Sequence, residues 1–166
     1  MAQEHVIYDF DSKDDRNDWI IENDGVMGGL SQSSMSINKD GHGVFTGQIS
    51  LENNGGFASV RHETDIENVK KYKYVVLRVK GKPSTYQFRL KKSLQDPESY
   101  VQDFDVTSEW ENVKLDISTF YPTYRGRNLD LPKFDADVIK EVRILIGNKV
   151  EEEFKLQIDK IYLSNS

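Results

Sequence analysis

The stretch KYVVLRVKGKPSTYQFRL (residues 73–90) holds two runs of alternating apolar and polar side chains, separated by a glycine and a proline. In the first run Val75, Leu77 and Val79 share one face of an extended chain. In the second run an apolar face lies opposite a polar one, with Tyr86, Phe88 and Leu90 against Gln87, Arg89 and Lys91. A period of two predicts two β-strands, each with one face in a core.

Similar short runs recur about every dozen residues, with Gly, Asn, Asp and Pro between them, which is typical of all-β sandwiches. They include WENVKLDI (110–117), EVRILIG (141–147) and FKLQIDKIYL (154–163). In the last run the apolar positions change from even to odd near Asp159, which predicts a β-bulge there. Trp110 is expected to stand at the beginning of its strand, at the edge of the core. We expect roughly nine or ten strands in two layers.

Helical signals are weak along the whole chain. Only DDRNDWII (14–21) and DADVIKEV (135–142) could form a turn or two, and neither sustains an amphipathic stripe. The segment STFYPTYRGRNLDLP (118–132) is interpreted as a loop. No repeat or linker divides the chain, so residues 1–166 are predicted to form a single domain.

Composition excludes several classes of function. The formal net charge is -6, which argues against general attraction to nucleic acid or anionic lipid. The chain has no cysteine, so disulfides, thiolate nucleophiles and cysteine-ligated zinc are excluded. No apolar run approaches the ~20 residues of a membrane span, and MAQEHVIYDF (1–10) lacks the features of a secretory signal. We expect a cytoplasmic protein without membrane insertion.

The glycine-rich segment DGVMGGLSQS (24–33) raises the question of phosphate binding. A phosphate loop needs a helix after the turn and a G-x-G-x-x-G or Gly-Lys-Ser/Thr pattern, and neither is present. We therefore interpret its glycines as positions of positive φ or close backbone approach, with Asp24 bonding amides of the turn. A second segment, SLENNGGFASVR (50–61), is interpreted in the same way. The structural glycines are Gly25, Gly28, Gly29, Gly55 and Gly56.

Three segments together carry a family resemblance: NDGVMGGLSQS (23–33), FTGQISLENNGGFASVR (45–61) and YRGR (124–127). In their order and spacing they resemble the complex I intermediate-associated protein 30 family, named for a mitochondrial assembly factor of NADH:ubiquinone oxidoreductase. The resemblance extends from Phe10 to Ile161. It implies a galactose-binding-like β-sandwich, or jelly roll, similar to carbohydrate-binding modules. The chain looks like a stand-alone, bacterial version of the family.

Function is predicted from this resemblance and from two sets of basic residues. If the apolar faces point inward, Arg78 and Arg89 point outward and Arg61 lies nearby, so that three arginines could share one face. Arginine suits carboxylates, phosphates, sugar hydroxyls and protein interfaces, although pairing with nearby Asp and Glu on a solvated sheet is an equally simple interpretation. The second set, Tyr124, Arg125 and Arg127, forms either a recognition tip or a buttress for the glycine loops.

The leading hypothesis is a non-enzymatic module that binds a protein partner in the assembly of a larger complex. Its predicted contact residues are Asp24, Arg61, Arg78, Arg89, Trp110, Tyr124, Arg125 and Arg127. The alternative is a carbohydrate-binding module, in which Trp110, Tyr86 or Tyr124 stacks on a sugar. Alternation places Tyr86 on the core side and so weakens that alternative.

A hydrolase is the third hypothesis and the least favoured. His5, His42 and His62 are isolated in the sequence, and no nucleophile pairs with them in a known pattern. No cofactor is expected. The acidic segment DFDSKDDRND (9–18) could hold a structural calcium, but Lys13 stands at the fifth position of the calcium-loop pattern and the glycine is missing, which favours a solvated turn. The oligomeric state stays open.

Overall fold

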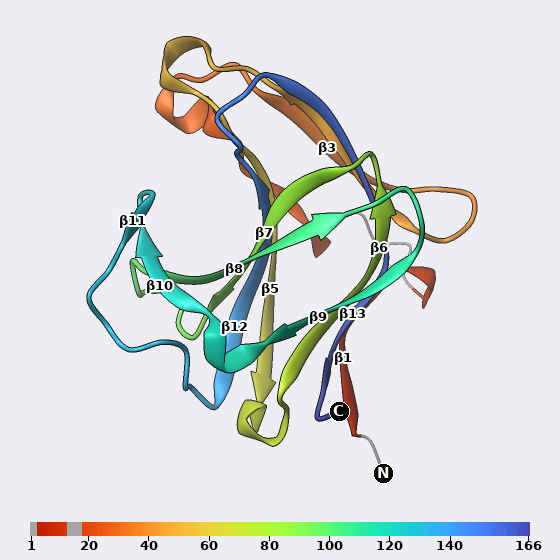
Figure 1. The fold of residues 1–166 in the computed structure, drawn as a ribbon, viewed down its shortest axis with the longest axis vertical. Helices are drawn as coiled ribbons and strands as arrows, with labels where there is room; N and C mark the ends of the chain where they lie inside the picture. The colour runs from red at the N-terminus through yellow and green to blue at the C-terminus, as the bar shows by residue number, and fades with distance from the viewer. Residues whose placement is uncertain (1–2, 13–17) are drawn as a thin grey trace.

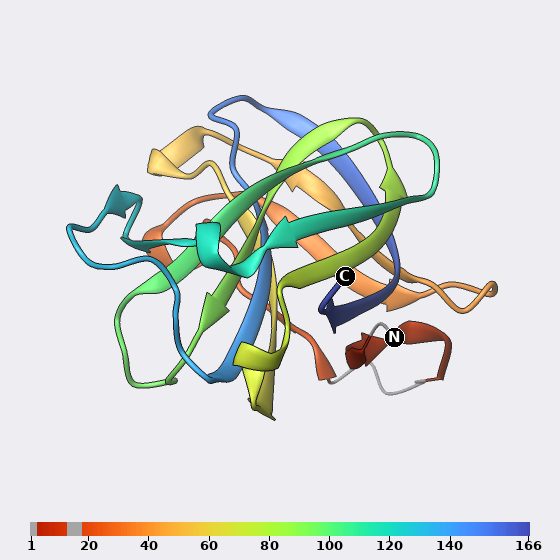
Figure 2. The same cartoon turned by 60° about the horizontal axis from the view of Figure 1, so that its bottom comes forward.

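The computed structural model describes residues 3–12 and 18–166, and it shows two facing antiparallel sheets (Figures 1 and 2). The described residues contain 13 strands rather than nine or ten. The strands are β1 Glu4–Asp9, β2 Ile20–Ile21, β3 Gln32–Ile37, β4 Gly43–Ile49, β5 Ala58–Glu67, β6 Tyr74–Gly81, β7 Ser84–Lys91, β8 Ser99–Val106, β9 Glu111–Asp116, β10 Tyr121–Tyr124, β11 Arg127–Asn128, β12 Val138–Ile146 and β13 Glu152–Ser164. Short 3-10 turns connect them, namely η1 Phe10–Ser12, η3 Asp24–Met27, η4 Glu52–Asn54, η5 Val69–Lys71 and η6 Ile117–Thr119.

Sheet A has the strand order β3-β4-β13-β6-β9, with β1 also paired to β13. Sheet B has the order β11-β10-β8-β7-β12-β5-β2. The first and last strands lie side by side, because β1 pairs with the C-terminal half of β13, from Glu4 with Ser164 to Asp9 with Lys160 (Figure 1). The predicted all-β sandwich is confirmed.

The core lies between the two sheets, as the alternation at residues 73–90 predicts. Val75, Leu77 and Val79 of β6 and the three apolar residues of β7 are all buried, including Tyr86 at 1% exposure. Burial of these large side chains supplies about 1.5–3 kcal/mol each relative to exposure. Tyr86 is therefore not available for stacking on a sugar ring.

A β-bulge interrupts β13 at the predicted place. Its register against β6 shifts between Ile158 and Lys160, which leaves Asp159 as the extra residue. The bulge marks the point where β13 changes one of its neighbours, since it pairs with β4 up to Ile158 and with β1 from Lys160. One inserted residue lets both halves keep their apolar side chains in the core.

Two expectations of local structure were wrong. Residues 138–142, considered for a helical turn, belong to β12 in sheet B together with the predicted strand run at 141–147, because pairing with β5 and β7 outweighs a weak helical pattern. Residues 121–128 form a hairpin of β10 and β11 rather than an open loop. Arg125 (φ 51°) and Gly126 (φ 77°) make its two-residue turn, and positive φ at both positions matches a type I′ turn.

Candidate functional site

The two glycine loops are joined through one buried carboxylate, Asp24. It accepts hydrogen bonds from the backbone amide of Ser31 at 3.0 Å, from the Ser31 hydroxyl, and from the amides of Gly56 and Phe57 at 2.7 and 3.3 Å. The predicted bond to an amide near its own turn is confirmed for Ser31, and the bonds to the second loop are additional. Asp24 is 0% exposed, so we place it outside the proposed binding surface.

The electrostatics of Asp24 agree with a structural anchor. Burial raises the pKa of this carboxyl group, but the hydrogen bonds from Ser31, Gly56 and Phe57 outweigh it and hold the pKa below the usual 3.8. The carboxylate is thus charged at neutral pH although no cation contacts it among the hydrogen bonds and ion pairs of the described residues.

The neighbouring glycines have two different physical reasons. Gly28 has φ 88° and Gly56 has φ 133°, which confirms positive φ at both. At Gly29 a Cβ atom would lie 2.4 Å from Cγ of Asp24, and at Gly55 it would lie 2.6 Å from its Oδ2. The close neighbour at both positions is the Asp24 side chain, and only Gly55 also meets a backbone atom, the Ser50 carbonyl oxygen at 2.9 Å, so the predicted close backbone approach is confirmed for Gly55 alone. Gly25 has neither positive φ nor a close neighbour.

The outer face of sheet B carries a row of three arginines on adjacent strands. Arg143 of β12 is the register partner of Arg61 of β5 on one side and of Arg89 of β7 on the other. Directly paired residues of antiparallel strands point to the same face, so the three guanidinium groups lie in one row, the arginine row. The row continues through Val101 of β8 to Tyr121 of β10.

The expectation that Arg61, Arg78 and Arg89 share one face was wrong for Arg78, which lies on β6 in sheet A. Arg143 takes the third position. The sequence analysis missed it, although the alternation in EVRILIG, with Val142 and Ile144 buried, already points Arg143 outward.

Two of the three arginines hold carboxylates. One oxygen of Glu22 lies 2.9 Å from Nε of Arg61 and 2.7 Å from Nη2 of Arg143. Glu141 lies 3.6 Å from Arg61 and 3.7 Å from Arg143, and Glu63 lies 3.2 Å from Arg61. The ion pairs expected for a solvated sheet are therefore present at this end of the arginine row.

Arg89 has a different environment from its two neighbours. It has no carboxylate within 4.0 Å among the described residues, and its half-buried side chain has a buried Nε without a hydrogen-bond partner. Burial and the charge of Arg143 lower the pKa of Arg89 to about 10, while Tyr121 and Glu141 act in the opposite direction. Arg89 is therefore still a cation at neutral pH.

Trp110 lies on the outer face of sheet A, not at the edge of the core. Its ring is 5.6 Å from the guanidinium carbon of Arg78, 5.3 Å from Nζ of Lys80 and 4.6 Å from the ring of His42. Arg78 also lies 3.6 Å from Asp159, the bulge residue. Cation–π contacts keep the half-buried indole on the outside of the sandwich.

The tip of the β10–β11 hairpin projects from the edge of sheet B (Figure 1). Tyr124, Arg125 and Arg127 are all exposed, and the guanidinium of Arg125 lies 5.3 Å from the ring of Tyr124. No hydrogen bond of the described residues joins Arg125 to the glycine loops. The described residues therefore do not support the buttress interpretation, and the recognition tip stays a prediction.

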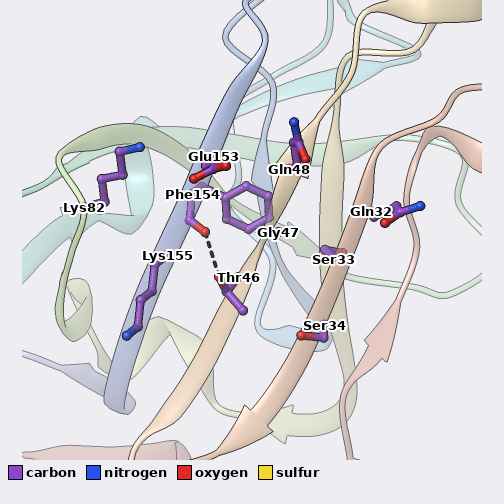
Figure 3. Close-up of a pocket in the computed structure, with 10 residues that line it drawn as sticks. All are labelled: Gln32, Ser33, Ser34, Thr46, Gly47, Gln48, Lys82, Glu153, Phe154 and Lys155. Carbon is purple, nitrogen blue, oxygen red and sulfur yellow. Dashed lines mark hydrogen bonds between the residues drawn. The ribbon is translucent and has the colours of Figure 1, made fainter.

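A groove of about 610 Å³ runs across β3, β4 and β13 of sheet A (Figure 3). Its side chains are amides, hydroxyls and charged groups, contributed by Gln32, Ser33, Ser34, Thr46, Gln48, Lys82, Glu153 and Lys155. The Thr46 hydroxyl donates to the backbone carbonyl of Phe154. The Phe154 ring is only 2% exposed, so the groove offers hydrogen bonds but no aromatic platform.

No cluster of three or more His, Asp or Glu side chains in residues 3–12 and 18–166 has the arrangement of a metal site. The acidic segment considered for calcium, residues 9–18, falls partly outside the described residues. Within the described chain, no helix has the length and apolar character needed to cross a membrane.

Comparison of the sequence with protein-family models shows which family the chain belongs to. The family model for complex I intermediate-associated protein 30 matches residues 8–158. The chain belongs to this family. The predicted resemblance is confirmed, and the matched segment contains both glycine loops and the arginine row.

Curated relatives of this family member come from a fungus and from an animal. An uncharacterized protein of Schizosaccharomyces pombe is 30% identical over 167 residues, which cover 87% of this chain and 76% of that protein. Complex I intermediate-associated protein 30, mitochondrial, of Mus musculus is 25% identical over 187 residues. That match covers 97% of this chain but 56% of the mouse protein.

Solved structures with the same fold include carbohydrate-binding modules. A family 11 module from Clostridium thermocellum, in complex with a β-1,3-1,4-mixed-linked tetrasaccharide, has a TM-score of 0.72 at 16% identity and covers 96% of this chain and 94% of its own. The family 11 module of the cellulase Lic26A-Cel5E gives a TM-score of 0.73 at 18% identity, with 97% and 94% covered. At such low identity these similarities establish the fold of the family member and no more.

The ion pairs of this family member predict a pH dependence. Burial raises the pKa of Glu22, but Arg143 and Arg61 outweigh it and hold the pKa below 4.5. A carboxyl group whose pKa is lowered by folding stabilises the fold when the pH is above the pKa of the unfolded state. This stabilisation is lost as the pH falls through the pKa of the folded state. We expect the melting-temperature difference between wild type and Glu22→Gln to be largest at pH 7 and to shrink below pH ~4.5. A difference that is constant from pH 7 to pH 3 would contradict the assigned charge pairing.

Proposed function

We propose that this chain is a non-catalytic binding module that contacts a protein partner through the outer face of sheet B and the adjoining hairpin tip. The observation that carries the proposal is the arginine row, three guanidinium groups held in register on adjacent strands of a rigid sheet. Ile20, 42% exposed, is the register partner of Arg61 at one end, and Tyr124, 40% exposed, lies in the hairpin beyond the other. Arginine and aromatic side chains beside exposed apolar groups are typical of protein interfaces.

The kind of partner protein is proposed from the name of a curated relative. The mouse relative is named as an intermediate-associated protein of complex I, and we extend an assembly role of that kind to this chain. The partner would be a subunit or partly assembled form of a larger complex. Loops and strand faces on a rigid sandwich are suited to this role because they present side chains without a large ordering cost.

Affinity purification from the chain's own host tests this proposal. Tagged wild type is compared with Arg125→Ala/Arg127→Ala at the hairpin tip, with Gln87→Glu/Lys91→Glu beside the arginine row, and with Arg78→Ala in sheet A as the matched control. We expect wild type and control to retain the same proteins, and both sheet B variants to lose most of them, since changes at the centre of an interface cost at least about tenfold in affinity. Captured proteins are then purified and titrated singly. Equal retention by all four forms would overturn the proposal.

Carbohydrate binding is the second candidate function, and the similarity to carbohydrate-binding modules favours it. The half-buried Trp110 on sheet A is the tryptophan placed for contact with a ligand, because Trp19 is 6% exposed. Titration of tryptophan fluorescence with mixed-linked β-glucan and a panel of other polysaccharides tests it, with Trp110→Phe as the control. A saturable response in wild type that is absent in the variant would favour this function over protein binding. A flat response across the panel counts against it.

A further inference from the structure

Arg89 is set apart from the other two arginines by what surrounds it. Arg61 contacts three carboxylates within 3.6 Å, and Arg143 contacts two within 3.7 Å. Arg89 occupies the next position of the same row and contacts none within 4.0 Å among the described residues. The row thus ends in a cation whose charge is not neutralised by direct pairing.

Glu22 shows how this face holds a carboxylate. Glu22 comes directly after the edge strand β2 in the sequence. One of its carboxylate oxygens lies between two adjacent guanidinium groups, 2.9 Å from Nε of Arg61 and 2.7 Å from Nη2 of Arg143. Arg89 and Arg143 are also direct register partners. A second carboxylate beside Arg89 would therefore meet the same spacing of donors one strand further along the sheet.

The state of Arg89 without such a partner is costly. Its Nε is buried and lacks a hydrogen bond, and its proximity to Arg143 disfavours both charges. A carboxylate bound to the guanidinium would offset the repulsion from Arg143. Arg89 lies on β7, between β8 and β12, so its backbone position is fixed before binding.

The groups around Arg89 favour a carboxylate over a phosphate. Tyr121 lies in the same row, Lys91 and Gln87 are on its own strand, and Asp103 of β8 is the register partner of Gln87. Glu141 of β12 is the register partner of Lys91. These two carboxylates would repel a dianion such as phosphate more strongly than the single charge of a carboxylate.

We infer that Arg89 is a specificity-determining residue that pairs with the carboxylate of an Asp or Glu side chain in an acidic segment of the partner protein. This inference rests on the proposed function and names the chemistry that its surface recognises. The pairing would reproduce, with a carboxylate of the partner, the contact that Arg61 and Arg143 make with Glu22.

Nuclear magnetic resonance of the full chain, labelled with ¹³C and ¹⁵N, tests this inference through the Nε–Hε signal of Arg89. The probe is hexaglutamate with both ends blocked, and blocked hexaglutamine is its neutral match. We expect a saturable shift of the Arg89 signal with hexaglutamate and none with hexaglutamine. Loss of a charge-assisted hydrogen bond in Arg89→Gln should weaken binding about tenfold or more. Arg78→Gln, on the other sheet, should bind like wild type.

Two further probes distinguish the source of the anion. Inorganic phosphate or trigalacturonate binding more tightly than hexaglutamate at Arg89 would overturn the inference of an acidic protein segment. An unmoved Arg89 signal, or equal shifts with both peptides, would also overturn it. Arg89→Lys keeps the charge but loses the planar guanidinium, and we expect its affinity to lie between those of wild type and Arg89→Gln. It replaces Arg89→Gln in the test if that variant does not fold. If sheet B captures a partner protein but the Arg89 signal does not shift with hexaglutamate, this inference alone is refuted. If no partner protein is captured, the proposed function is refuted.

Discussion

Replacing Asp24 by alanine is expected to lower the free energy of unfolding by about 3–5 kcal/mol, because one buried and two part-buried backbone amides lose their acceptor at about 1–3 kcal/mol each. These amides belong to Ser31, Gly56 and Phe57, and they lie in both glycine loops. The Ser31 hydroxyl loses a partner as well. Chemical denaturation followed by circular dichroism measures the effect.

The control for this prediction is Asp130→Ala, which removes an exposed carboxylate and should change stability by less than about 0.5 kcal/mol. Asp24→Asn keeps one acceptor oxygen but turns an amide group toward backbone donors, so it should fall between wild type and Asp24→Ala. A loss below about 1 kcal/mol for Asp24→Ala would show that water replaces the carboxylate and that the two loops do not depend on it.

Replacing Gly56 by valine should lower the free energy of unfolding by about 3 kcal/mol. At φ 133° this position lies where side chains are strongly disfavoured, which costs about 1–3 kcal/mol, and β-branching adds to it. An added Cβ would also lie 3.3 Å from Cδ2 of Leu51. Displacement of the Gly56 amide would further weaken its 2.7 Å bond to Asp24. Thermal unfolding measures the loss.

Gly126→Asn is the matched comparison for this second prediction. Gly126 has φ 77° with no atom within 4 Å of an added Cβ, and asparagine tolerates this left-handed region, so the expected cost is below about 1 kcal/mol. An unchanged melting temperature for Gly56→Val together with loss of partner capture would contradict the structural interpretation of this glycine. The glycine loops would then act in recognition rather than in folding.

Much of the fold follows from local alternation. The faces of β6 and β7, the bulge at Asp159 and the positive φ of Gly28 and Gly56 were all predicted, because each depends on a few consecutive residues. The β10–β11 hairpin was missed because its turn carries Arg125-Gly126, in which arginine occupies a positive φ that is more often taken by Asn, Asp or Gly. The strand at residues 141–147 was predicted, but its beginning at residues 138–140 was assigned to a possible helical turn, because the pairing that extends it involves strands far away in the sequence.

The sequence by itself determined that this chain is an all-β sandwich of its family and which residues of each strand face the core, because period two needs no knowledge of the partner strand. Only the tertiary structure decided which outward residues meet. The strand order places Arg78 in the other sheet, away from Arg61 and Arg89. It also places Arg143 between Arg61 and Arg89. It also turns Asp24 from a candidate ligand contact into a buried link between loops. Strand order is set by long-range packing of the whole core, which no short stretch of sequence encodes.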